Sequence, residues 1–281
     1  MRRSVTIVLI LAAVGALVVP AGAQDTCFSL PTAYLSDELR LAGVMMKPAG
    51  FGPFPAVIYS HSSKAGQERR PTVPEGVPCF AFVADRRWVY FVPDRRGYGR
   101  SEGPTLNDAI GHRSGLRLLL AVTARSRQEA GDIVAGVEFL RRRPFVDHGR
   151  VAGVGYALGG LYTYLAASAR PDAFSAIVLQ AVDSGEYSGL LLREMIRAGK
   201  SITAPILIQQ ARDDEGAPVR FVQDLTDALR RMGKDVTLRV YPGGSELFTP
   251  ESRGPDSEWG KDLLEFLARQ FSDTRQFSGT R

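Results

Sequence analysis

The motif most closely related to catalysis is a glycine-rich turn, Gly-Tyr-Ala-Leu-Gly at 155–159. An apolar run at 151–154 leads into this turn, and the chain after it has the pattern of a helix. A strand, a Gly-x-Ser-x-Gly turn and a helix together form the sharp elbow that exposes a nucleophilic serine. Here Ala157 stands where the serine would be, and a methyl group cannot attack a carbonyl carbon. The turn therefore predicts an elbow without its nucleophile, the alternative being an ordinary strand-to-helix turn.

Alternating strands and helices must position this turn. Short apolar runs predict buried strands at 54–61, 88–94, 150–156, 174–182, 204–211 and 236–242. Helical patterns occupy 127–142, 158–169, 187–199, 219–232 and 257–271. Polar and apolar residues alternate over 33–48, which predicts an antiparallel hairpin at a sheet edge. The whole pattern predicts an α/β fold with one mostly parallel central sheet flanked by helices on both faces.

Ligands of such sheets bind beside the carboxyl ends of the strands. The loops that follow His61, Gly155, Ala211 and Pro242 should therefore build any site. His61 itself is expected to have a structural rather than a catalytic role.

Four segments in order resemble α/β-hydrolases of the dienelactone hydrolase and esterase type. They are DRRGYGRSEGP (94–104), GYALGG (155–160), ARDDEGAPV (211–219) and YPGGSELF (241–248). The resemblance covers about residues 35–270 and implies the α/β-hydrolase fold for a single domain.

The same resemblance implies where a catalytic triad would lie. The nucleophile falls on Ala157, the acid on Asp214 with Asp213 one position away, and the histidine base on Glu246. The three histidines of the chain are His61, His112 and His148, and all precede Asp214. The order Ser, Asp, His therefore cannot be completed in the usual way.

An oxyanion-binding region could survive without the triad. The resemblance places the backbone N–H of Leu158 there, next to Tyr156 of the elbow. Ser62 and Ser63 replace the His-Gly that is more usual in the second donor loop. A carbonyl or carboxylate could bind at this position without being cleaved.

Three functions are compatible with these residues. The favoured one is a binding or interaction module for a small ester-like or carboxylated ligand. The second is an active carboxylic-ester hydrolase whose nucleophile is another residue, such as Ser63, Ser184 or Ser245. The third is a non-hydrolytic enzyme on the same fold, such as a lyase or a cofactor-free oxygenase. No cofactor is expected, and no cysteines and histidines have the spacing of metal ligands.

The N-terminus has the pattern of an export signal. Two arginines precede an uncharged apolar stretch, and Ala21-Gly22-Ala23 fits the cleavage rule. We expect a signal peptide at 1–23, a domain at 24–272 and a flexible tail at 273–281. The mature chain would be periplasmic or secreted, the alternative being an uncleaved membrane anchor.

Cysteine use and charge limit the partners. Cys27 and Cys79 either form one disulfide, as exported proteins permit, or are two free buried thiols. Loss of Arg2 and Arg3 lowers the formal net charge from +5 to +3. The arginines are scattered along the chain and form no basic stripe with interleaved aromatic residues, so nucleic-acid binding is not expected. No membrane contact is expected after signal cleavage, and the oligomeric state stays open.

Overall fold

The computed structural model describes residues 27–62, 70–74, 79–182, 188–214, 216, 218–243 and 256–272. The predicted signal peptide and tail lie outside these residues. So do four residues of the sequence analysis, namely Ser63, Ser184, Ser245 and Glu246. The structure therefore does not test the predictions made for these segments and residues.

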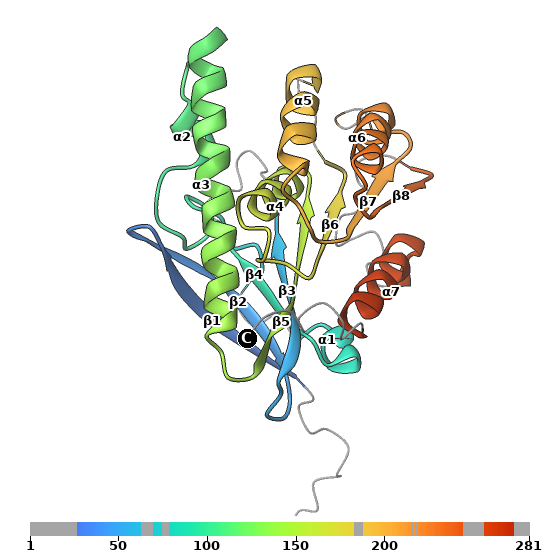
Figure 1. The fold of residues 1–281 in the computed structure, drawn as a ribbon. Helices are drawn as coiled ribbons and strands as arrows, with labels where there is room; N and C mark the ends of the chain where they lie inside the picture. The colour runs from blue at the N-terminus through green and yellow to red at the C-terminus, as the bar shows by residue number, and fades with distance from the viewer. Residues whose placement is uncertain are drawn as a thin grey trace, which may run out of the picture.

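Eight strands of the described chain form one sheet (Figure 1). They are β1 (Cys27–Ser36), β2 (Leu39–Pro48), β3 (Phe54–Ser60), β4 (Val89–Pro93), β5 (Val146–Tyr156), β6 (Ala176–Gln180), β7 (Ile206–Ala211) and β8 (Val236–Tyr241). Their order is β1-β2-β4-β3-β5-β6-β7-β8. The hairpin of β1 and β2 pairs antiparallel with β4, and the pairs from β4 to β8 are parallel.

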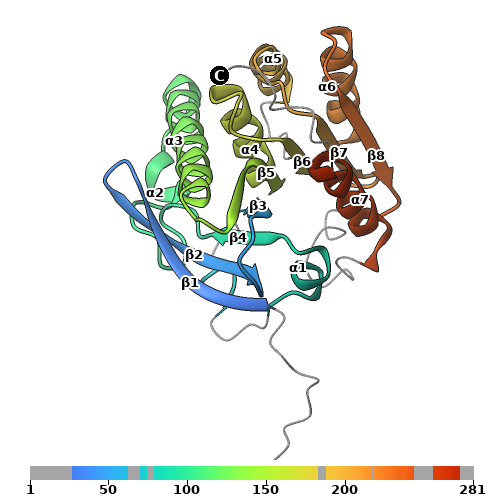
Figure 2. The same cartoon turned by 60° about the horizontal axis from the view of Figure 1, so that its bottom comes forward.

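Helices cover both faces of the sheet. In chain order they are α1 (Ala81–Arg86), α2 (Leu106–Ile110), α3 (Gly115–Arg141), α4 (Leu158–Ala169), α5 (Ser188–Gly199), α6 (Val219–Arg231) and α7 (Glu258–Ser272). Figure 2 shows α3 to α6 on one face and α1 with α7 on the other. Successive residues of β3 serve the two faces, since Ile58 packs in the core beneath α3 and α4 and Val57 in the core beneath α7.

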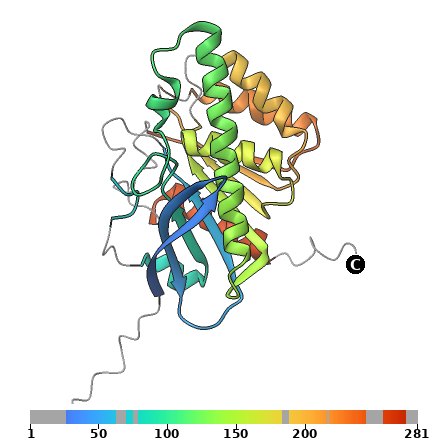
Figure 3. The ribbon, with the colours of Figure 1, turned by 90° about the vertical axis from the view of Figure 1, so that its left-hand side faces the viewer.

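The predicted fold class is confirmed, and most predicted elements end within a few residues of the observed ones. The largest difference is α3, which begins at Gly115 instead of near residue 127 (Figure 3). Its first turns contain the run LRLLLAV at 116–122, which is apolar on several sides and therefore lacks the one-sided period that predicts a helix. No helix within the described ranges has the length and hydropathy needed to cross a membrane.

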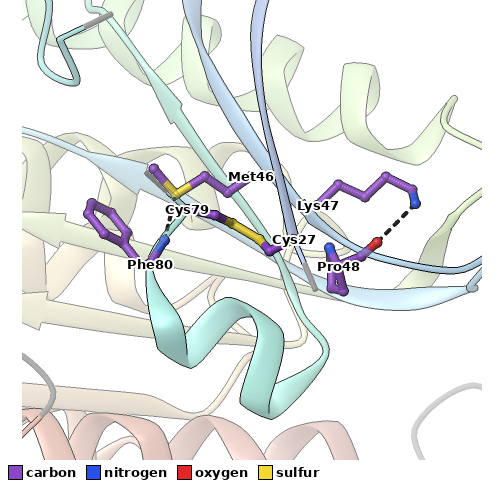
Figure 4. The surroundings of a disulfide bond; sticks show 6 residues. All are labelled: Cys27, Met46, Lys47, Pro48, Cys79 and Phe80. Atoms are coloured by element: carbon purple, nitrogen blue, oxygen red, sulfur yellow. Dashed lines mark hydrogen bonds between the residues drawn. A yellow bond between two sulfur atoms is a disulfide. The ribbon is translucent and has the colours of Figure 1, made fainter. Parts of the chain in front are cut away.

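Cys27 and Cys79 are joined by a disulfide in the structure (Figure 4). Their Cα atoms are 5.9 Å apart, within the usual range for such a bond. The bond ties the start of β1 to the segment that leads into α1. Beside it, the backbone N–H of Phe80 donates to Sδ of Met46 at 3.5 Å. The N-terminal edge of the sheet is thus covalently attached to the body of the domain.

Candidate active-site elbow

Close backbone packing forms the elbow between β5 and α4. A Cβ atom added to Gly155 would overlap the carbonyl oxygen of Gly159. One added to Gly159 would overlap the carbonyl oxygen of Ser60 in β3. Only glycine fits at either position, so both glycines of the motif are required by the turn.

Ala157 has the strained backbone of an elbow residue. Its φ is 50° and its ψ is −117°, a combination that residues with a Cβ rarely adopt. Its N–H donates to the carbonyl oxygen of Gln180 at 2.8 Å, which helps to hold this conformation. Strain of this kind costs about 1–3 kcal/mol and is concentrated at functional sites. The backbone at 157 therefore has the conformation of an elbow that exposes a nucleophile, although the side chain of Ala157 is a methyl group.

The acid position lies beyond β7. Asp214 is buried, and its Oδ1 accepts a hydrogen bond from the N–H of Gly216 at 3.0 Å. Asp213 is exposed, and its N–H donates to the carbonyl oxygen of Gly243 at 2.9 Å, next to the end of β8. The sequence left one position of ambiguity between them, and burial favours Asp214.

The other predicted site residues that the structure describes lie at the same edge of the sheet. Leu158 begins α4, where the first N–H groups of a helix have no partner within the helix. Tyr156 is half-buried and packs against the cluster of Ala181, Ala211 and Tyr241. Ser62 is half-buried two residues after β3, and Ser60 pairs with Gly155. The structure thus brings the elbow and the loop after β3 together.

His61 is held by backbone groups through both ring nitrogens. Nδ1 lies 2.6 Å from the carbonyl oxygen of Ser62, and Nε2 lies 3.1 Å from the backbone nitrogen of Arg95. A neutral ring with its proton on Nδ1 satisfies both contacts. Burial, reinforced by the charge of Arg95, lowers the pKa of His61 to about 4. This geometry agrees with the structural role expected for His61.

His61 should make stability depend on pH between about 6.5 and 4. Its pKa is about 6.5 when unfolded and about 4 when folded, so the unfolded chain binds more protons in this window. Stability should therefore fall as pH falls, by about 2 kcal/mol between pH 7 and pH 5. Urea unfolding at the two pH values measures this loss.

A His61→Gln variant should lose this dependence, and the exposed His112→Gln variant is its matched control. Burial raises the pKa of Asp94 and of Asp132, so these two carboxyls make stability rise as pH falls. The contribution of His61 is therefore measured as the difference in pH dependence between the wild type and the variants. Equal pH dependence in wild type and His61→Gln would contradict the assignment.

A buried ion cluster next to His61 was not predicted. Arg95 donates from Nε and Nη2 to the two carboxylate oxygens of Glu129, at 3.0 and 2.7 Å. Arg125 donates from Nε to the same carboxylate at 2.9 Å. The guanidinium of Arg95 also lies 4.8 Å from the ring centroid of Tyr162 in α4. Through these contacts α3 and α4 hold the loop that follows β4.

A second pair extends the cluster, because Arg96 contacts both carboxylate oxygens of Asp132 at 2.6 Å. The sequence carried a signal for this cluster. Arg125, Glu129 and Asp132 recur with helical spacing beside the predicted apolar face of α3. Such spacing alone does not distinguish solvated from buried charges, and the arginines of the 94–104 segment supply the buried partners of Glu129 and Asp132.

The described residues contain no metal-binding cluster, and two open cavities lie in other parts of the described chain. No group of three or more His, Cys, Asp or Glu residues in this part of the chain is arranged to hold a metal. One open cavity of about 510 Å³ lies around Arg86, Arg87 and Arg150, and another of about 580 Å³ lies between α6 and β8. Neither of these two cavities is lined by residues of the 155–160 turn.

Comparison with known proteins decides the family. The model of the dienelactone hydrolase family matches residues 83–265, more than half of the chain. The chain belongs to the dienelactone hydrolase family. This member is 26% identical over 148 residues to a Methylorubrum extorquens protein named as a candidate carboxymethylenebutenolidase. That match covers 51% of each chain.

Solved structures support the α/β-hydrolase fold of this family member. A candidate dienelactone hydrolase from Klebsiella pneumoniae matches with a TM-score of 0.60 at 17% identity, over 88% of this chain and 99% of that one. A cold-adapted esterase from an Arctic intertidal metagenomic library gives 0.58 at 17% identity, over 87% and 94%. An acylaminoacyl peptidase from Pyrococcus horikoshii gives 0.65 at 19% identity, and this chain spans 42% of its length.

Proposed function

We propose that this dienelactone hydrolase family member is exported and lacks triad hydrolysis, and that its elbow region binds a small ester-like or carboxylated ligand without cleaving it. The observation that carries the proposal is Ala157. Its backbone has the conformation of a nucleophile elbow, and its side chain offers no atom that can attack a carbonyl.

The base position supports the same conclusion. Glu246 occupies the place of the family's histidine, and no histidine follows residue 148 in the sequence. At an ordinary pKa of about 4.3, a glutamate is a weak base near neutral pH. A site that has lost both nucleophile and base has no route to an acyl-enzyme intermediate.

The proposed ligand class follows from the backbone N–H groups that the site keeps. The first N–H groups of α4 and the glycine-rich turn favour a carbonyl or carboxylate oxygen. The name of the Methylorubrum relative refers to a butenolide that carries a carboxylate, which has both groups. We therefore place carboxylated lactones and esters first among the ligands to be tried.

Export is supported by the N-terminal pattern at 1–23 and by the Cys27–Cys79 disulfide. N-terminal sequencing of the exported chain should begin at Gln24. A chain that begins at Met1 and stays in the membrane fraction would identify the uncleaved anchor instead.

The decisive experiment is an ester-hydrolysis assay on the purified chain that starts at Gln24. With short-chain nitrophenyl esters, wild type should show no turnover above a denatured control and no labelling by a serine-directed phosphonate. Ala157→Ser alone should also stay inactive, because no histidine accepts the serine proton. The Ala157→Ser, Glu246→His double variant is the one in which turnover and labelling can return.

The same assay distinguishes the alternative of an active hydrolase. Saturable turnover by wild type, together with a phosphonate adduct on Ser63, Ser184 or Ser245, would refute the loss of hydrolysis. Mass spectrometry of the adduct would then identify the nucleophile. Titration calorimetry with a carboxylated lactone tests the binding half, and absence of heat with every carboxylated ligand tried would refute it.

A further inference from the structure

The first turns of α3 expose an apolar surface that the fold does not use. All the buried residues of this 27-residue helix lie between Arg125 and Leu140. Before them, Leu116 is 70% exposed and Leu120 is 60% exposed. Two large apolar side chains one turn apart, both open to solvent, indicate a surface that contacts something else.

Basic side chains share this surface with the leucines. At 3.6 residues per turn, Leu116, Arg117, Leu120 and Arg127 fall on one side of α3, and both arginines are exposed. We call these four residues the α3 tip surface. Leucines interleaved with arginines on one helical face are typical of helices that lie in the headgroup region of a membrane.

The tip lies at the same end of the molecule as the elbow. The amino end of α3 lies at the end of the sheet where the parallel strands finish, and so does α5 (Figure 1). At the start of α5, Leu190 is 45% exposed. Segments 105–124 and 188–199 together carry four arginines against two carboxylates. These two described segments are therefore net positive and expose apolar side chains.

We infer that the α3 tip surface docks the mature protein onto an anionic lipid membrane. The arginines would contact phosphate headgroups, and the leucines would enter the boundary between headgroups and acyl chains. The sequence alone gave no reason to expect membrane contact, because it did not show that these leucines are exposed.

Charge argues against a second copy of this chain as the occupant. A symmetric dimer through this face would bring the same patch of both subunits together. Arg117 and Arg127 of the two copies would then meet without a facing carboxylate from the patch itself. An anionic surface, in contrast, complements both arginines.

Vesicle cosedimentation with the chain that starts at Gln24 tests this inference independently of the proposed function. The apolar stretch before Gln24 would bind lipid by itself, so it must be absent. The chain should bind vesicles rich in phosphatidylglycerol, bind phosphatidylcholine vesicles weakly, and lose binding as salt screens the arginines.

The Leu116→Ser, Leu120→Ser variant should lower the partition coefficient at least about tenfold, since each leucine loses its apolar transfer free energy. The Arg117→Glu, Arg127→Glu variant should remove the preference for anionic lipid. The matched control is Phe51→Ser, because Phe51 is 98% exposed but lies before β3, at the opposite end of the sheet. Circular dichroism checks that all variants are folded.

Three outcomes would overturn the inference. Wild type could fail to bind anionic vesicles, or the leucine variant could bind as wild type does. Alternatively, light scattering could reveal a dimer that the leucine variant converts to a monomer while vesicles stay unbound, which would assign the surface to a second copy.

Discussion

Replacing Glu129 with alanine is expected to lower the free energy of unfolding by about 3–5 kcal/mol. The substitution would leave Arg95 and Arg125 without the carboxylate that both contact. Their side chains are 4% and 1% exposed, so water cannot replace the lost partner. Uncompensated buried charge is among the few causes of so large a loss from one substitution.

The matched control for this prediction is on the same helix. Glu138 contacts Arg141 at 3.4 Å and Arg170 at 3.5 Å, but its side chain is 38% exposed. Removing a solvated partner of this kind should cost less than about 1 kcal/mol. Urea unfolding with linear extrapolation measures both variants. Similar losses for Glu129→Ala and Glu138→Ala would contradict the importance of the buried cluster.

The cluster also predicts a response to acid. Burial alone would raise the pKa of Glu129, but the facing guanidiniums of Arg95 and Arg125 lower it below its ordinary value. The charged form therefore stabilises the folded state above the ordinary pKa, and this contribution is lost as pH falls through the lowered one. Glu129→Gln, which removes the charge while keeping the shape, should lack this acid-dependent part.

Removing the disulfide is expected to cost about 4 kcal/mol of stability. The bond joins residues 52 positions apart, and opening so long a loop raises the conformational entropy of the unfolded chain. A Cys27→Ser, Cys79→Ser variant should therefore unfold at lower urea concentration. Reduced wild type should lose about as much, whereas the reductant should not affect the double serine variant.

Thiol titration shows whether the bond forms in the exported protein. Unreduced, unfolded protein should contain no reactive thiol. Two titrating thiols would support the other interpretation left open by the sequence, in which both cysteines are free. In that case the double serine variant should have nearly the stability of wild type.

The order of strands and helices from β5 onward could be predicted from the sequence. Short apolar runs and one-sided helical patterns are local properties, and they located α4 at 158–169 as observed. The elbow was equally local, because two glycines and a strand–turn–helix pattern specify it. The absence of a nucleophile at Ala157 and of a histidine after residue 148 can also be read directly from the sequence.

Other features depend on which residues meet in three dimensions. The buried carboxylate at 214 and the exposed one at 213 differ only in how the chain turns after β7. The Arg95–Glu129 pair joins residues 34 positions apart, and neither residue type is normally buried. Pairing across the fold, rather than local pattern, made their burial favourable.

The amino end of α3 is the converse case, in which apolar residues are exposed. Six of the seven residues at 116–122 are apolar, and apolar side chains of this kind are more often buried than exposed. The tertiary structure decides otherwise, because the buried residues of α3 lie only between Arg125 and Leu140. Hydropathy reports what a side chain prefers, and only the packing of the whole chain decides whether that preference is met.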